Sequence, residues 1–275
     1  MPTTVVSGAT GRLGGRVAAR LDRPQRLLVR DAARAPRIAG AEVAEADYGD
    51  PAAVRAALKG AGTVLMVSAS ESLDRVDRHR AFVDAAAAAG VAHLVYTSFA
   101  GARPDATFTL ARDHWATEEH IRASGLPFTF LRDNLYADFV PGLAGEDGVI
   151  RGPGGDGRAA VVAQDDIADA IVAVLRDPGP HAGRTYDLTG PEALTFAEMA
   201  AALTEATGYE FRYHDETVEE AYASRASYGA PPWQVDAWVS TYTAVAAGEL
   251  AIVDPAIEQL TGRRARTLAE LLHAS

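Results

Sequence analysis

Three regularly spaced glycines near the start of the chain have the arrangement of a phosphate-binding turn. Gly8, Gly11 and Gly14 follow a short β-branched stretch, residues 3–6, and precede apolar residues at helical spacing. In such a strand–turn–helix unit the glycines permit a tight turn, close approach of a pyrophosphate and close helix packing. The first N–H groups of the helix lack internal partners and stabilise phosphate. The pattern favours a dinucleotide site over a turn without ligand, with contacts from Gly8, Thr10, Gly11, Arg12, Leu13 and Gly14.

An arginine stands where the second strand of such a unit would end. Arg30 closes the stretch 26–30, and this position lies beside the adenosine ribose, where an acidic residue would bind the 2′-hydroxyl of NAD. A guanidinium suits phosphate because its donors form a rigid fork. Arg30, together with Arg12 and Arg34, therefore predicts NADP(H) as the cofactor. The alternative is a set of solvated surface arginines, and Asp31 would repel a phosphate if its side chain turned inward.

Further small or polar residues follow the other expected strands. The alternation of apolar stretches with helical spacing predicts strands over residues 42–46, 63–67, 93–98, 126–132 and 185–189. They would form a doubly wound parallel sheet of the Rossmann type, an α/β fold that binds ligands at the carboxyl ends of its strands. The residues expected to contact the cofactor there are Asp47, Ser68, Ala69, Ser70, Thr97, Ser98 and Asn134.

The overall composition narrows the class of protein. A length of 275 residues is enough for one large α/β domain with an added lobe. The net charge of −11 offers no basic surface to nucleic acid or to an anionic membrane. The chain has no cysteine, so disulfides and thiol catalysis are excluded, and no metal site is predicted. Without a signal-like start or a long apolar run, we expect a cytoplasmic protein.

The character of the sequence changes near residue 190. Helical patterns with short links follow, and aromatic residues concentrate there. We predict that residues 1–135 form the NADP-binding domain, completed by about 159–190. Residues 136–158, with an irregular glycine-rich loop, and residues 191–275 would form a smaller, mostly helical substrate-binding lobe. Its aromatic residues are expected to be mostly core, with a minority facing the substrate, Trp233 among them.

Taken together, these motifs resemble the NmrA-like group of atypical short-chain dehydrogenase/reductases, and within it most of all the type-2 NADPH:quinone oxidoreductases. The stretches that carry the resemblance are residues 8–14, 28–30, 46–50, 67–70, 96–98, 114–118, 131–136 and 155–157. The resemblance implies an oxidoreductase that transfers hydride from NADPH to a small-molecule substrate, a quinone or a related carbonyl compound.

The acid that most short-chain dehydrogenases use is missing. It is a tyrosine followed four residues later by a lysine, and the single lysine, Lys59, has no tyrosine at that spacing. The resemblance places His114 where isoflavone-type reductases carry a catalytic lysine and quinone reductases a histidine. His114 could supply a proton or hold the nicotinamide ribose, and the alternative is an ordinary surface histidine. We expect His114 and Tyr136 to be catalytic, and the substrate to contact Phe99, Trp115 and Trp233.

Two other functions are compatible with the sequence. A non-catalytic NADP(H)-sensing regulatory protein of the NmrA type would explain the loss of the usual catalytic pair. A ketoreductase for a larger natural product would suit the aromatic lobe. Consumption of NADPH in the presence of a quinone separates an enzyme from a sensor. The sequence leaves the physiological substrate and the oligomeric state open.

Overall fold

The computed structural model describes residues 3–274 and is built around a seven-stranded sheet in the order β3-β2-β1-β4-β5-β6-β8. The strands are β1 (Thr3–Ser7), β2 (Gln25–Val29), β3 (Glu42–Glu45), β4 (Ala61–Met66), β5 (His93–Phe99), β6 (Phe128–Asp133) and β8 (Arg184–Leu188). β1 pairs in parallel with both β2 and β4, and β2–β3 and β4–β5 are parallel too. The central strands β1, β4 and β5 are buried along most of their length because both faces of the sheet are covered. The predicted Rossmann-type fold is confirmed.

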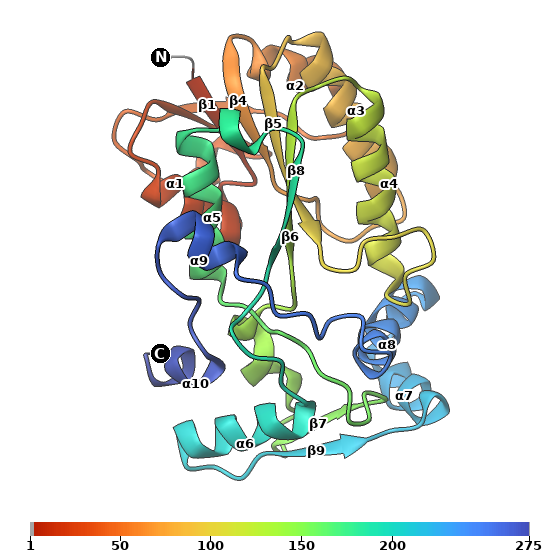
Figure 1. Ribbon diagram of the computed structural model, residues 1–275. Coiled ribbons are helices and arrows are strands. Elements are labelled where there is room, and N and C mark those ends of the chain that lie inside the picture. The colour runs from red at the N-terminus through yellow and green to blue at the C-terminus, as the bar shows by residue number, and fades with distance from the viewer. Residues whose placement is uncertain (1–2, 275) are drawn as a thin grey trace. The chain divides into compact units, whose positions relative to one another are not determined.

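Helices cover both faces of this sheet (Figure 1). One face carries α1 (Arg12–Arg20) and α5 (Gln164–Arg176), and the other carries α2 (Pro51–Leu58), α3 (Arg75–Ala88) and α4 (Thr109–Ala123). The Asp50 side chain caps α2, since its carboxylate accepts from the amides of Ala52 and Ala53. Two short 3₁₀ turns, η1 (Ala32–Arg34) and η3 (Gly179–His181), complete this part. Among residues 3–274, no helix has both the length and the apolar composition to cross a bilayer.

The chain divides into two compact units. The first comprises Met1–Phe99, Asp113–Arg132 and Gln164–Tyr186, and the second Ala100–Arg112, Asp133–Ala163 and Asp187–Ser275. The second unit contains the helices α6 (Phe196–Thr207), α7 (Val218–Arg225), α8 (Pro232–Ala246), α9 (Ala256–Thr261) and α10 (Leu268–His273). Its 3₁₀ turns are η2 (Ala137–Leu143) and η4 (Ala226–Tyr228).

A small parallel sheet in the second unit corrects one sequence prediction. Strand β7 (Val149–Gly152) lies inside the segment predicted to be irregular, and β9 (Arg212–Asp215) lies in the part predicted to be helical. The two strands pair, with Ile150 opposite Tyr213. Both are short, and β9 is mostly polar, so neither shows the alternating apolar pattern that identifies a strand in sequence.

Candidate functional site

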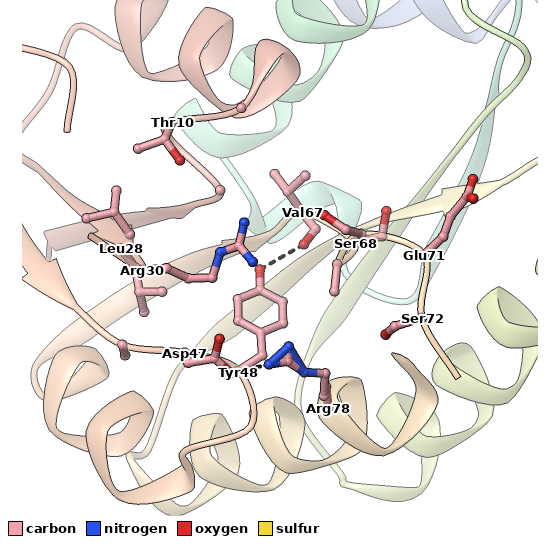
Figure 2. Close-up of a pocket in the computed structure, with 16 residues that line it drawn as sticks. Thr10, Leu28, Arg30, Asp47, Tyr48, Val67, Ser68, Glu71, Ser72 and Arg78 are labelled. Carbon is pink, nitrogen blue, oxygen red and sulfur yellow. Dashed lines mark hydrogen bonds and ion pairs between the residues drawn. The ribbon is translucent and has the colours of Figure 1, made fainter. Parts of the chain in front are cut away.

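A cavity of about 370 Å³ opens in the first unit where β1, β2, β3 and β4 end (Figure 2). The carboxyl ends of parallel strands are where a doubly wound sheet binds ligands. The predicted cofactor residues that line this cavity are Gly8, Thr10, Gly11, Arg30, Asp47, Ser68, Ala69 and Ser70.

The glycine turn has the geometry that its spacing predicts. Gly8 has a φ of +63°, a backbone conformation that residues with a side chain rarely adopt. A Cβ on Gly14 would lie 2.3 Å from the Gly8 carbonyl oxygen, so only glycine allows α1 to pack this closely. Gly11 is the N-cap of α1 and offers no side chain to its first amides, which suits a bound pyrophosphate. Leu13 is buried in the core and Arg12 is exposed, and neither lines the cavity.

Tyr48 closes a ring of hydrogen bonds at the floor of the cavity. Its hydroxyl donates to the Val67 carbonyl at 2.7 Å, the Val67 amide donates to Ser7 Oγ at 2.9 Å, and Ser7 Oγ is hydrogen-bonded to the Tyr48 hydroxyl. The ring joins the ends of β1 and β4 and fixes the wall between them. Burial raises the pKa of Tyr48, so this hydroxyl stays neutral. Sequence reasoning missed Tyr48, although it follows the predicted Asp47 directly.

Arg30 is the cation in the cavity that lacks a carboxylate partner. Within residues 3–274 it makes no hydrogen bond or ion pair, and it extends toward the Tyr48 hydroxyl (Figure 2). The second arginine of the cavity, Arg78, binds Asp47 at 2.6 Å and so balances its charge. Asp31, the expected source of repulsion, accepts from the Ala33 amide and caps η1 instead. An unbalanced guanidinium here fits the extra phosphate of NADP(H).

Arg34 does not line the cavity, and Arg78 does. Arg34 is an exposed residue of η1, so the predicted three-arginine cluster is not assembled around the cavity. Arg78 comes from α3, and sequence reasoning missed it. The only signal in the sequence is its spacing from Asp74, with which it forms an i,i+4 ion pair.

Two buried side chains of α3 hold the small-residue loop that borders the cavity. His79 Nε2 accepts from the Ala69 amide at 2.9 Å, and Arg75 Nε donates to the Ala69 carbonyl at 3.0 Å. Because Nε2 is the acceptor, the hydrogen of His79 is on Nδ1, which donates to Thr117 Oγ1 at 2.9 Å. Burial lowers the pKa of His79 to about 3, so this histidine is neutral. Both backbone groups of Ala69 are therefore fixed from the helix.

Three predicted cofactor residues use their side chains elsewhere. Thr97 Oγ1 accepts from the Ser68 amide at 2.9 Å and so supports the same loop. Ser98 Oγ donates to the fully buried Glu118 at 2.6 Å. Asn134 belongs to the second unit, where its amide group hydrogen-bonds two backbone groups. None of the three is among the residues that line the cavity.

His114 is buried in the first unit with both ring nitrogens engaged. Arg75 Nη2 lies 3.0 Å from Nε2, and the Tyr96 hydroxyl lies 2.9 Å from Nδ1. A guanidinium only donates, so Nε2 accepts and the hydrogen on Nδ1 points at Tyr96. Burial, and then the Arg75 charge, hold the pKa of His114 well below its usual range. This geometry favours a positioning role, and catalysis by His114 stays a prediction.

The predicted substrate residues Phe99 and Trp115 contact different partners in the first unit. The Phe99 ring lies 6.1 Å from the ring of His114, whereas the Trp115 ring is 5.6 Å from the guanidinium of Arg122. In the second unit, Tyr136, which was predicted to be catalytic, donates to Asp133 at 2.5 Å and lines a cavity of about 580 Å³, and its catalytic role stays a prediction. Trp233 is half-buried and is not among the residues that line that cavity.

Curated relatives match nearly the whole chain. Quinone oxidoreductase 2 of Escherichia coli (strain K12) is 34% identical over 275 residues, which cover 96% of each chain. The (4-alkanoyl-5-oxo-2,5-dihydrofuran-3-yl)methyl phosphate reductase of Streptomyces griseus is 38% identical over 278 residues, covering 95% of this chain and 94% of its own.

Solved structures agree with the sequence matches. The NADPH-dependent quinone oxidoreductase of Escherichia coli in complex with NADPH has a TM-score of 0.90 and 33% identity, with 99% of both chains covered. The Citrobacter triphenylmethane reductase in complex with NADP(H) has a TM-score of 0.88 and 32% identity, again with 99% of both chains covered. Residues 8–178 match the model of the family described as NAD(P)H-binding. The chain therefore belongs to the NAD(P)H-binding family.

Proposed function

We propose that this protein is an NADPH-dependent reductase that transfers hydride to a quinone or a related carbonyl compound. The observation that carries the proposal is the 34% identity with quinone oxidoreductase 2 over 96% of both chains. The first unit supports it with a cavity that combines a glycine turn, a helix start without a side-chain cap, and Arg30, which has no carboxylate partner within residues 3–274.

The residues present fit the cofactor. The amides at the start of α1 would hold the pyrophosphate, with Gly11 allowing its close approach. Arg30 would bind the 2′-phosphate through its guanidinium. NADPH supplies the hydride when it is bound, and the chain contributes binding and orientation. The loop fixed by His79 and Arg75 would border the bound nucleotide at Ala69.

The proton balance suits a strong acceptor. One quinone, one NADPH and one proton give one hydroquinone and one NADP⁺. Hydride transfer to a quinone leaves a hydroquinone anion, a stable species that water can protonate, so no strong protein acid is required. A neutral His114 whose hydrogen points at Tyr96 is compatible with this reaction. The relatives named for quinones and triphenylmethane dyes act on conjugated acceptors, which supports the same substrate class. Consumption of NADPH is also compatible with the cytoplasmic location that we propose.

The test is a stoichiometric assay. The protein is mixed under nitrogen with NADPH and 1,4-benzoquinone, and the absorbance of the reduced nicotinamide is followed together with hydroquinone formation. We expect one hydroquinone for each NADPH consumed, and slower consumption of NADH. A protein that only senses the nucleotide would bind NADPH and leave it unconsumed, which would contradict the proposal.

A further inference from the structure

We propose that the cavity of the second unit is a binding site for the flat, apolar ring system of an uncharged aromatic acceptor of naphthoquinone type. Its use in catalysis rests on the proposed function, whereas the binding itself stands on the geometry of the second unit. The volume of about 580 Å³ lies within the usual range for small-molecule sites, about 300–1,000 Å³.

Aromatic pairs form much of the wall of this cavity. Each pair lines it, and the ring centroids within a pair are close. The pairs are Tyr136–Phe139 at 5.4 Å, Tyr228–Trp238 at 6.0 Å and Phe196–Tyr242 at 4.8 Å. Such rings favour another ring, by stacking or by edge-to-face contact, over an irregular aliphatic ligand.

Glycines of the β7 segment hold two of these rings in place. A Cβ on Gly152 would lie 2.3 Å from the Tyr242 ring, and a Cβ on Gly154 would lie 2.6 Å from the Phe196 ring. The rings therefore pack directly on the backbone, where any side chain would push them out. The wall is preformed, which limits the entropy lost when a rigid ligand binds.

The charges on the wall are paired. The two charged residues that line the cavity are Arg151 and Arg225. Arg225 binds Glu216 at 3.0 Å and lies over the Tyr242 ring at 5.2 Å, and Arg151 binds Asp147 at 2.6 Å. With both guanidinium groups already balanced, the cavity offers no unpaired charge to an anionic ligand, so an uncharged one fits better.

Three of the hydroxyl groups on the wall already donate to protein acceptors. Ser224 Oγ donates to the Ala221 carbonyl at 3.2 Å, and Thr241 Oγ1 donates to the Ala237 carbonyl at 3.0 Å. Tyr136 donates to Asp133. A polyhydroxylated ligand such as a sugar would find few free donors here, which again favours an apolar ring system.

The binding test uses two exposed tyrosines of the second unit. Tyr228 lines the cavity and is 70% exposed, whereas Tyr209 is 75% exposed and does not line it. Binding of 2-naphthol, which the enzyme cannot reduce as a quinone, is measured by equilibrium dialysis without NADPH. We expect Tyr228→Ala to weaken binding about threefold to tenfold, the loss of one aromatic contact, and Tyr209→Ala to leave it unchanged.

A second variant fills the cavity. Leu143 is half-buried and lines it, so Leu143→Trp should weaken 2-naphthol binding more than about tenfold, with folding checked by thermal melting. The same variant should lower kcat/KM for 1,4-naphthoquinone more than kcat/KM for the smaller 1,4-benzoquinone.

The outcomes separate the two proposals. Equal binding of 2-naphthol by the wild type, Tyr228→Ala and Leu143→Trp would overturn this site, even if benzoquinone is still reduced. Equally tight binding of 2-naphthalenesulfonate would overturn the preference for an uncharged ring. Selective 2-naphthol binding without any NADPH consumption would support the site and contradict the proposed reductase function.

Discussion

We propose that Arg30 decides the choice between the two nicotinamide cofactors. It is exposed, lines the cavity of the first unit and has no carboxylate partner within residues 3–274. Replacing Arg30 by alanine removes a charge-assisted hydrogen bond worth about 1.5–3 kcal/mol, so NADPH should bind roughly tenfold to hundredfold more weakly. NADH lacks the 2′-phosphate, so the affinity of Arg30→Ala for NADH should fall much less. Affinities of both nucleotides, measured by calorimetry for wild type and Arg30→Ala, check this.

Arg34 provides the matched control for Arg30. It lies in the neighbouring turn, is exposed and stays outside the cavity. Arg34→Ala should therefore leave the affinity for NADPH nearly unchanged. Equal losses for NADPH and NADH in Arg30→Ala would refute the assignment to the 2′-phosphate.

His114 is expected to act through its two partners. Replacing it by alanine leaves the Tyr96 hydroxyl and one Arg75 N–H group without this buried partner. Each lost partner should lower the free energy of unfolding by about 1–3 kcal/mol. Urea unfolding should show this loss. Because the pKa of His114 lies well below its usual range, kcat of the wild type should show no inflection from this histidine between about pH 6 and 8.

The control for His114 is a second histidine on the same helix. His120 is partly exposed and pairs with Asp84 at 2.7 Å, so His120→Ala should cost little stability. A neutral-pH inflection in kcat that His114→Ala abolishes would instead identify His114 as the acid.

The residues of the site differ in how far the sequence could predict them. Gly8 and Gly14 were predictable because backbone conformation and close packing demand glycine at fixed spacing. Tyr48 and Arg78 were not, because their contacts depend on the tertiary fold. Tyr48 meets Ser7, which is 41 residues away along the chain.

At the scale of elements, α3 holds the loop that borders the cavity of the first unit. His79→Leu removes the acceptor for the Ala69 amide and the donor to Thr117. We expect KM for NADPH to rise severalfold, because the loop loses a buried hydrogen bond worth about 1 kcal/mol or more, while kcat changes less. His79→Gln can keep one amide oxygen near Ala69 and should recover part of the loss. Steady-state kinetics of both variants test this role.

An exposed residue of α3 serves as the control for His79. Asp77 is solvent-exposed, and its ion pair with Arg80 is a surface contact at 3.4 Å. Asp77→Ala should leave KM for NADPH unchanged. If His79→Leu and His79→Gln reduced thermal stability alone, with KM unaltered, His79 would be structural and would not position the loop.

Most elements of the first unit could be predicted, and those of the second less well. The central strands of the large sheet carry apolar runs between helical patterns, so alternation identifies them. β7 and β9 have no such pattern, since the polar Arg212, His214 and Asp215 make up most of β9. Their pairing arises from tertiary contacts of the second unit, which local sequence does not encode.

At the scale of the whole molecule, the buried histidines of the first unit link stability to pH. Burial lowers the pKa of His79 to about 3, and it also lowers the pKa values of His93 and His114. The unfolded chain takes up these protons near pH 6.5, whereas the folded protein does not. Below that pH the unfolded state binds more protons, so stability must fall as pH decreases.

The expected slope is about 1.4 kcal/mol per pH unit for each histidine that stays neutral in the folded state. This contribution is complete above about pH 6.5 and is lost as pH falls toward the folded pKa. Carboxylates with lowered pKa values, such as Asp147 at about 2, change the stability mainly below about pH 4. The contributions of the histidines and of the carboxylates therefore fall in different pH ranges. Urea unfolding of wild type and His79→Gln between about pH 7.5 and 4.5 measures the slope. The free energy of unfolding of the variant should fall less steeply with decreasing pH, because one histidine no longer contributes to the slope. Parallel curves for the wild type and the variant would mean that His79 is not the neutral buried group described here.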